Sequence, residues 1–397
     1  MKILGLMSGT SLDGIDVALV NVDGASTDDF SWEVLGHQSV PYRADQRARI
    51  QSIIRGGNAQ SLCNLNVQLG EWFSQASLDF LSDRKIEPSE VSLIGSHGQT
   101  VWHVPPDPDQ DRRGSTLQLG CAATIAERTG VDVVSDFRSR DMAAGGHGAP
   151  LVAWTDQLMF TRPEGPRCLQ NIGGMANVTW LPARGTEGSS DRPFAFDTGP
   201  GCALIDEAVR LVTDGGQTFD RDGRIAGRGT VNEELLQELM SEPYLSESPP
   251  KSTGRERFGA DYVKAVADGL GLAPGSTQGW PGLVMTLVEF TAASIADAYE
   301  KWIVPKGIGE VVVTGGGARN PVLMKRLEAR LAPALLTPAE AVLGFDPDAK
   351  EAVAFAVLAW ANRCAVPSNL IEATGAARSV VLGSLTPGAS GAGAARV

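Results

Sequence analysis

The sequence predicts two α/β domains with a cleft between them. The first observation is length, because 397 residues exceed what one hydrophobic core usually supports. The second is a pair of β-rich segments joined by a glycine-containing turn, which occurs near residue 8 and again near residue 173. The third is that strand-like and helix-like patterns alternate after each hairpin. Such alternation indicates sheets covered by helices, with room for a ligand between the two domains.

We expect residues 1–140 to form the first domain and residues 141–385 the second, with the last helix able to pack back on the first domain. The boundary is placed near the run 145–148, because consecutive glycines permit a hinge. The sequence from Gly383 onward is rich in Gly, Ala and Ser, so we expect fraying there and a flexible tail over 386–397.

Turn residues and apolar spacing predict the elements of the first domain. Ile3–Met7 and Ile15–Val22 are predicted strands, joined by a turn that contains two glycines. Apolar residues at helical spacing predict a helix over Ser61–Ser82. Val91–Gly95 is a predicted buried strand, and the proline- and aspartate-rich segment Pro105–Gly114 is a predicted loop.

The second domain repeats the pattern. Strands are predicted at Arg167–Ile172, Ala176–Leu181, Phe194–Phe196 and Val311–Thr314. Helices are predicted at Ala203–Val212, Pro321–Leu331 and Lys350–Arg363.

Composition excludes several classes of protein. A net charge of −13 without clusters of Lys and Arg argues against a nucleic-acid partner. The five cysteines form no CxxC pair, so we expect buried thiols in a reducing compartment. Polar residues interrupt every apolar run before it could serve as a signal peptide or membrane span. We therefore expect a soluble cytoplasmic protein with no membrane partner.

The first candidate site is the turn after the first strand. Amides of a tight turn can point into one concavity, which suits a phosphate group, and hydroxyls can add donors. Two carboxylates in the turn could hold Mg²⁺ directly or through water, although a plain hairpin turn is an equally good interpretation. The candidate ATP and phosphate residues are Gly9, Thr10, Ser11, Leu12, Asp13, Gly14, Ile15 and Asp16, with Asp13 and Asp16 as metal ligands.

The second candidate site is Phe196-Asp197-Thr198-Gly199-Pro200-Gly201. A carboxylate at a strand end, followed by glycines that open a helix, combines a general base with a helix N-terminus that can face phosphate. We take Asp197 as the base, with Gly199 and Gly201 beside phosphate. The alternative is an aspartate that only caps the helix.

The third is Gly315-Gly316-Gly317, followed by Asn320. Three glycines leave no side chains over the loop, so a nucleotide base or ribose could lie against the backbone. A simple strand-to-helix turn explains the same residues. The P-loop sequence GxxxxGK[ST] does not occur in the chain.

Polar residues elsewhere are candidates for a sugar site. An arginine can bind a carboxylate in a bidentate manner, and a glutamate can accept from a hydroxyl. A structural histidine, a surface ion pair and an exposed glutamate at a helix start are the corresponding alternatives. The candidate substrate residues are His97, Gly98, Gln99, Thr100, Arg138, Asp141, Gly174 and Glu351.

In order, these features resemble the actin, sugar kinase and Hsp70 ATPase superfamily. The segments LGLMSGTSLDGIDVALV, SHGQTVWHVP, SDFRSRDMAAGGHGAPLV, NIGGMANVTWL, FDTGPG, VTGGGARNPVLM and GFDPDAKEAVAFAVLAW together resemble the 1,6-anhydro-N-acetylmuramic acid kinase family. The similarity runs from Ile3 to about Trp360. It implies an actin-like, ribonuclease H-like fold in both domains.

The resemblance also implies an activity. Water opens the 1,6-anhydro bridge, and the released 6-oxygen takes the γ-phosphoryl group of ATP with Mg²⁺ as cofactor. The product is N-acetylmuramic acid 6-phosphate, in recycling of cell-wall peptidoglycan. The base of the family matches Asp197, its nucleotide turn Gly9–Asp16, and its adenosine loop Gly315–Gly317. As partners we expect the sugar, ATP and a second copy of the chain in a homodimer.

Three alternatives stay open from the sequence. One is a kinase of the same superfamily that acts on a hexose or on acetate. Another is an actin-like ATP-binding module without sugar chemistry. A transcriptional regulator is disfavoured, because no basic recognition helix precedes Ile3.

Overall fold

A computed structural model describes residues 1–9, 11–106, 113–184 and 192–389. The chain divides into two compact units, one of Met1–Met159 with Asp348–Val397 and one of Phe160–Pro347. This division lies later in the chain than the expected 140/141 boundary, which falls inside helix α4 (Phe137–Ala143). It also assigns the C-terminal segment to the first unit.

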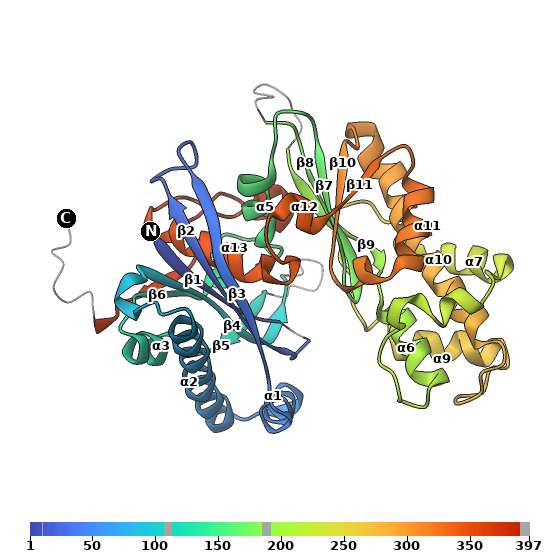
Figure 1. Cartoon of the computed structure of the whole chain (residues 1–397), viewed down its shortest axis with the longest axis horizontal. Helices are drawn as coiled ribbons and strands as arrows, with labels where there is room; N and C mark the ends of the chain where they lie inside the picture. The colour runs from blue at the N-terminus through green and yellow to red at the C-terminus, as the bar shows by residue number, and fades with distance from the viewer. Residues whose placement is uncertain (10, 107–112, 185–191, 390–397) are drawn as a thin grey trace. The chain divides into compact units, whose positions relative to one another are not determined.

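The first unit is built on a mixed sheet whose strand order is β12-β6-β4-β1-β2-β3, with β5 paired to β4 (Figure 1). Strands β1 and β2 are antiparallel, as are β2 and β3, whereas β4 runs parallel to both β1 and β6. The strands are β1 (Lys2–Ser8), β2 (Gly14–Asp23), β3 (Ser31–Pro41), β4 (Leu93–Val104), β5 (Ser115–Leu119), β6 (Val133–Ser135) and β12 (Ser384–Thr386).

Helix α13 packs directly on the first sheet because two glycines make room for it. Gly5 of β1 and Gly95 of β4 are register partners. A Cβ atom on Gly5 would lie 1.8 Å from the carbonyl oxygen of Ala352, and one on Gly95 would lie 2.1 Å from that of Phe355. The helices of this unit are α1 (Ala44–Gly56), α2 (Ala59–Asp83), α3 (Ala122–Thr129), α4, α5 (Val152–Phe160), α13 (Lys350–Arg363) and α14 (Ile371–Thr374).

The second unit contains a sheet of order β11-β10-β7-β8-β9. Strands β7, β8 and β9 are successively antiparallel, and β10 runs parallel to both β7 and β11. Numbered within each unit, the first sheet has the order 3-2-1-4-6-7 and the second the order 3-2-1-4-5. Both share the order 3-2-1-4 followed by a parallel strand, which confirms the α/β, ribonuclease H-like fold class. The strands are β7 (Arg167–Ile172), β8 (Met175–Leu181), β9 (Phe194–Pro200), β10 (Glu310–Thr314) and β11 (Leu335–Pro338).

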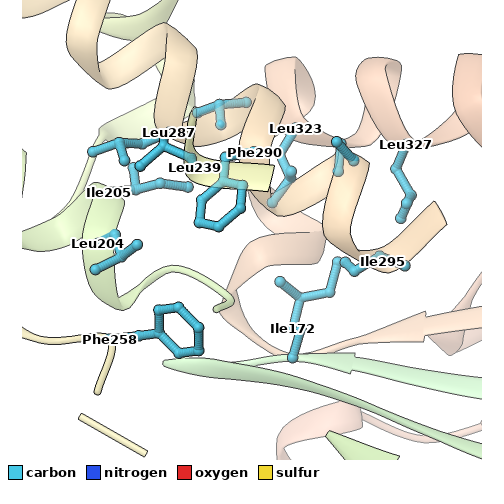
Figure 2. Close-up of a cluster of buried hydrophobic side chains, with 14 of the residues drawn as sticks. Ile172, Leu204, Ile205, Leu239, Phe258, Leu287, Phe290, Ile295, Leu323 and Leu327 are labelled. Carbon is cyan, nitrogen blue, oxygen red and sulfur yellow. The ribbon is translucent and has the colours of Figure 1, made fainter. Parts of the chain in front are cut away.

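The core of the second unit lies between this sheet and its helices. Figure 2 shows Ile172 of β7 facing side chains of helices α6, α10 and α11. Helix α10 is almost wholly buried, which explains why its apolar residues lack helical spacing. The helices are α6 (Ala203–Val212), α7 (Glu233–Met240), α8 (Pro243–Ser246), α9 (Ala260–Gly269), α10 (Trp280–Ala298), α11 (Pro321–Leu331) and α12 (Ala339–Leu343).

Several expectations about individual elements need correction. Strand β4 continues through the motif at 96–100 rather than ending before it. Within the segment expected to fray from Gly383, Ser384–Thr386 forms β12 and the Gly388 amide donates to Asp132 Oδ1, whereas 390–397 of the expected flexible tail lies outside the described residues. Cys63 is exposed rather than buried. Part of the predicted loop 105–114 lies outside the described residues. Within the described ranges, no helix has both the length and the apolar character needed to cross a membrane.

Candidate active site

The turn between β1 and β2 is held by its own backbone. The Leu12 amide donates to Gly9 O at 3.3 Å, and Arg47 Nε donates to Leu12 O at 2.8 Å. Leu12 is buried and has a φ of 57°, which is unfavourable for a leucine. Gly14 begins β2 and packs against β3, since a Cβ there would lie 2.4 Å from Val40 O. Thr10, another predicted phosphate residue, lies outside the described residues.

Gln99 supports this turn. Ser8 Oγ lies 2.7 to 2.9 Å from Gln99 Oε1, Tyr42 Oη and Gly14 O. Gln99 Nε2 donates to Gly9 O at 3.1 Å. Gln99 is fully buried, so its contacts connect the middle of β4 with the predicted phosphate turn.

Gly98 and Thr100, which flank Gln99 on β4, contact the neighbouring strand β5. Gly98 has a φ of 76°, and a Cβ there would lie 2.7 Å from Leu119 O. Thr100 Oγ1 accepts a hydrogen bond from Gln118 Nε2 at 3.2 Å.

His97 and Arg138 form a buried polar pair. His97 Nδ1 lies 2.9 Å from Gly98 O, and Arg138 Nε donates to His97 Nε2 at 3.1 Å. The imidazole is therefore neutral, with its proton on Nδ1. Burial, and secondarily the charge of Arg138, lowers the pKa of His97 to about 3. Arg138 Nη1 donates to Gly148 O at 2.7 Å, which ties the pair to the glycine-rich run 145–148.

Asp141 organises the same run. Its side chain is fully buried and accepts from the Gly148 amide, Asn369 Nδ2 and Thr374 Oγ1, each at 2.8 Å. A Cβ on Gly146 would lie 2.2 Å from Asp141 Oδ2. The three donors surround the carboxylate, so Asp141 supports the loop instead of presenting a free group.

Glu351 lies in the first turn of α13. The residue keeps an exposed side, yet the pKa of its carboxyl group is raised, mainly because surrounding protein atoms reduce its solvation. The charges of Lys350 and Arg138 oppose this rise, and the charge of Asp16 adds to it. Lys350 Nζ forms a buried ion pair with Asp156 Oδ2 at 2.9 Å, which fixes the start of the helix. The first unit thus brings Glu351, Arg138 and Asp16 into electrostatic contact.

The predicted metal ligands each have a polar partner. Ser11 Oγ donates to Asp13 Oδ1 at 2.8 Å, and Ser39 Oγ donates to Asp16 Oδ1. Burial is the main cause of a raised pKa at the hydroxyl of Tyr42, and the charges of both carboxylates raise this pKa further. No group of three metal-ligating side chains occurs in the part of the chain that the structure describes. Two carboxylates fit Mg²⁺ held largely by water and phosphate oxygens.

Asp197 of β9 is held at three of its atoms. Its Oδ2 accepts from the Thr253 amide at 2.9 Å, its amide donates to Lys251 O at 3.1 Å, and its carbonyl oxygen accepts from Tyr244 Oη at 2.8 Å. Burial raises the pKa of Asp197 to about 6. Its carboxylate is therefore positioned and still ionised at neutral pH, as a general base requires.

The turn between β7 and β8 occupies the position in its unit that Gly9–Asp13 occupies in the other. Its carbonyl oxygens accept hydrogen bonds from amides just before and at the start of α6: Gly201 and Ala203 donate to Gly174 O, and Cys202 donates to Gly173 O. We expected these amides to face phosphate; the structure shows them already engaged. Gly199 adopts a φ of 149° beside Leu245 and Ser294.

The three glycines of the predicted adenosine loop differ in surroundings. A Cβ on Gly315 would lie 2.5 Å from Asn171 Oδ1. A Cβ on Gly317 would lie 2.4 Å from Ile172 Cγ2. Nothing lies within 4 Å of a Cβ on Gly316. Asn320 caps α11, with its Oδ1 accepting from the amides of residues 322 and 323. Packing explains two of the glycines, and only Gly316 leaves an open surface.

The Lys251–Arg257 loop contacts Asp197, although no motif in the sequence marks it as part of the site. Besides contacting Asp197, this loop places Arg255 Nη2 3.5 Å from where a Cβ on Gly174 would stand. The run Lys-Ser-Thr-Gly-Arg-Glu-Arg combines small and charged residues between two predicted elements. That composition was the available signal.

Two sheets that share the strand order 3-2-1-4, with a glycine turn in the first hairpin and a positioned carboxylate, define a kinase-like α/β protein. The profile of the family described as "Anhydro-N-acetylmuramic acid kinase" matches residues 1–388. The chain belongs to this family. It is 42% identical to the anhydro-N-acetylmuramic acid kinase of Caldanaerobacter subterraneus subsp. tengcongensis over 97% of this chain and 96% of that protein. It is also 42% identical to the Bacillus cereus (strain ZK / E33L) protein of that name, over 97% and 99%.

Proposed function

We propose that the chain is an ATP-dependent kinase of 1,6-anhydro-N-acetylmuramic acid. In the proposed reaction, water adds to the anomeric carbon, and the bond from that carbon to the bridging oxygen breaks. The released 6-oxygen bonds to the γ-phosphorus of ATP as the bond to the β,γ-bridging oxygen breaks, and ADP leaves. The product is N-acetylmuramic acid 6-phosphate, which would feed recycling of cell-wall sugar. Membership of the family over nearly the full chain carries the proposal. The held carboxylate of Asp197 supports it.

Asp197 would take a proton from the attacking water. With a pKa of about 6, most of its carboxyl group is ionised at pH 7, yet it is more basic than an ordinary aspartate. Such general-base assistance accelerates a reaction about 10²–10⁴-fold. The proton leaves the water as the carbon–oxygen bond forms, and the 6-oxygen departs with its electron pair toward phosphorus.

The first unit would bind sugar and phosphate. Arg138, oriented by His97, offers a cation to the carboxylate of the substrate, and Glu351 offers an acceptor to a hydroxyl. The Gly9–Asp13 turn would face phosphate. Asp13 and Asp16 would hold Mg²⁺ through water, and this ion would neutralise phosphate charge. Gly316 would lie beside the adenosine.

Replacement of Asp197 tests the role of the base. Asp197→Asn keeps the shape and the acceptor for the Thr253 amide, so we expect a folded protein that binds ATP and loses nearly all turnover. Turnover is measured as ADP release that depends on the anhydro sugar, with ATP binding measured by calorimetry. Near-normal turnover in the variant would refute the assignment.

A substrate panel separates the alternatives. A hexose or acetate kinase would transfer phosphate to those acceptors, and an actin-like module would hydrolyse ATP slowly without regard to sugar. The proposed cytoplasmic location follows from the supply of ATP there. The proposed homodimer is tested by light scattering on the eluting protein, where a monomer mass would contradict it.

A further inference from the structure

Asp197 is held by two separate segments that one lysine connects. Helix α8 supplies the Tyr244 hydroxyl to Asp197 O, and the Lys251–Arg257 loop supplies the Thr253 amide to Asp197 Oδ2. Lys251 is 9% exposed, although its side chain is charged. Its Nζ donates to Tyr244 O at 3.1 Å and to Leu245 O at 3.4 Å, both in α8. The ammonium group therefore spans the two segments.

The same lysine lies over the ring that reaches Asp197. Lys251 Nζ is 4.6 Å from the centroid of the Tyr244 ring, a cation–π arrangement that favours a desolvated ammonium. Tyr244 thereby uses its carbonyl oxygen and ring for Lys251 and its hydroxyl for Asp197. A change at Lys251 would be transmitted to Asp197 through two hydrogen bonds.

The other end of the loop is anchored in the core. Phe258 follows the loop directly, is fully buried and lies in the cluster drawn in Figure 2. The amides of Arg257 and Phe258 donate to Gly254 O at 3.1 and 3.0 Å. The carboxylate of Glu256 lies over Gly254, where a Cβ would stand 2.3 Å from Glu256 Oε2. With Phe258 and the Arg257–Glu247 ion pair holding the far end, the Lys251 side chain fastens the near end of the loop to α8, two residues before Thr253.

We propose that Lys251 is a positioning residue for Asp197, fastening the Lys251–Arg257 loop to helix α8 so that α8 holds the backbone of Asp197 and the loop holds its carboxylate for proton abstraction. The inference rests on the proposed function, in which Asp197 is the base. Burying a lysine costs free energy that the contacts must offset. The contacts of Lys251 offset this cost and keep the carboxylate of Asp197 in a fixed position.

The charges around the pair make the proposal measurable. Lys251 opposes, and Glu256 adds to, the rise that burial causes in the pKa of Asp197. Removing the positive charge should raise the pKa of Asp197 further, whereas removing the negative charge should lower it. The groups that face Asp197 or Lys251 are Tyr244, Glu247, Glu256, Asp297 and Lys301. Asp297 and Lys301 form an ion pair at 2.6 Å and so largely offset each other.

The experiment compares Lys251→Met, Lys251→Arg and Glu256→Gln with the wild type across pH 5–9. We expect Lys251→Met to lower kcat about tenfold to a hundredfold, as misplacement of a catalytic group does, with little change in KM for ATP. The acidic limb of kcat/KM should move up by about 0.5–1 pH unit in Lys251→Met and down by a similar amount in Glu256→Gln. Lys251→Arg keeps the charge and should leave the limb in place.

A matched control is Lys264→Met, which removes an exposed lysine from the neighbouring helix α9 and should change neither kcat nor the limb. Wild-type kcat with an unmoved limb in Lys251→Met would overturn the proposal. Equal losses in Lys251→Met and Lys251→Arg at every pH, without movement of the limb, would also overturn it, since they would indicate support of folding alone. Because Glu256 is exposed, Glu256→Gln tests the coupling even if Lys251→Met fails to fold.

A second measurement does not depend on substrate. The carboxyl carbons of aspartate are labelled with carbon-13, and the Asp197 signal is assigned by its absence in Asp197→Asn. We expect that signal to titrate near pH 6 in the wild type, higher in Lys251→Met and lower in Glu256→Gln. An inactive wild type would contradict the proposed function. An Asp197 signal that titrates at the same pH in the wild type and in both variants would instead contradict this inference.

Discussion

Asp197 should destabilise the folded protein at neutral pH, and Asp197→Asn should relieve that effect. Burial raises the pKa of this carboxyl group from its usual 3.8 to about 6. Because the folded pKa lies above the unfolded one, folding favours the protonated form. The protonated carboxyl group therefore contributes stability that is complete below pH 4 and is lost as the pH rises through 6, where the buried group becomes charged. A rise from 3.8 to about 6 corresponds to about 3 kcal/mol, an upper limit because the side chain is not fully buried.

The assay is unfolding by denaturant at several pH values between 4 and 8, for the wild type and Asp197→Asn. We expect the free energy of unfolding of the variant, relative to the wild type, to increase by about 1–3 kcal/mol over this range, with half of the increase reached near pH 5, between the unfolded and folded pKa values, and little further change above pH 6 to 7. Asp268→Asn removes an exposed carboxylate from α9 and should give a difference that stays constant with pH. A pH-independent difference for Asp197→Asn would refute the reasoning, because the carboxylate would then not be desolvated.

The glycine contacts give two further predictions. Gly5→Ala would drive a methyl group into the backbone of α13 and should cost about 1–3 kcal/mol or more, seen as a lower melting temperature, whereas Gly56→Ala at the end of α1 meets open space and should not destabilise. Equal melting temperatures would contradict the close packing of α13. Gly317→Ala should likewise destabilise, since it collides with β7, whereas Gly316→Ala should keep the melting temperature and weaken ADP binding measured by calorimetry. Unchanged ADP affinity in Gly316→Ala would contradict the assignment of this loop to adenosine.

Local signals in the sequence predicted both hairpins, but they did not predict where β4 and β9 end. The β1–β2 hairpin and the β7–β8 hairpin follow from apolar runs around glycine turns, which depend on neighbouring residues only. Asp197 could be proposed as a candidate from the sequence because a carboxylate before glycines and a helix is a local pattern. The strand order, by contrast, depends on pairing between distant segments.

Other features could not be predicted because they depend on contacts far apart in sequence. Nothing near Lys350 shows that α13 returns to pack on Gly5 and Gly95. The role of Gln99 arises only when β4 meets the turn at Gly9. Likewise, the Lys251–Arg257 loop contacts Asp197 across more than fifty residues of chain, so no periodic pattern marks it.

The most direct test of the central claim is a transfer assay with ATP, Mg²⁺ and 1,6-anhydro-N-acetylmuramic acid, in which the sugar product is identified by mass. The account predicts that the product gains the mass of one phosphoryl group and one water, and that Asp197→Asn forms almost none of it. A product that gains the phosphoryl group alone would mean that the anhydro bridge stays closed, and it would contradict the role given to Asp197.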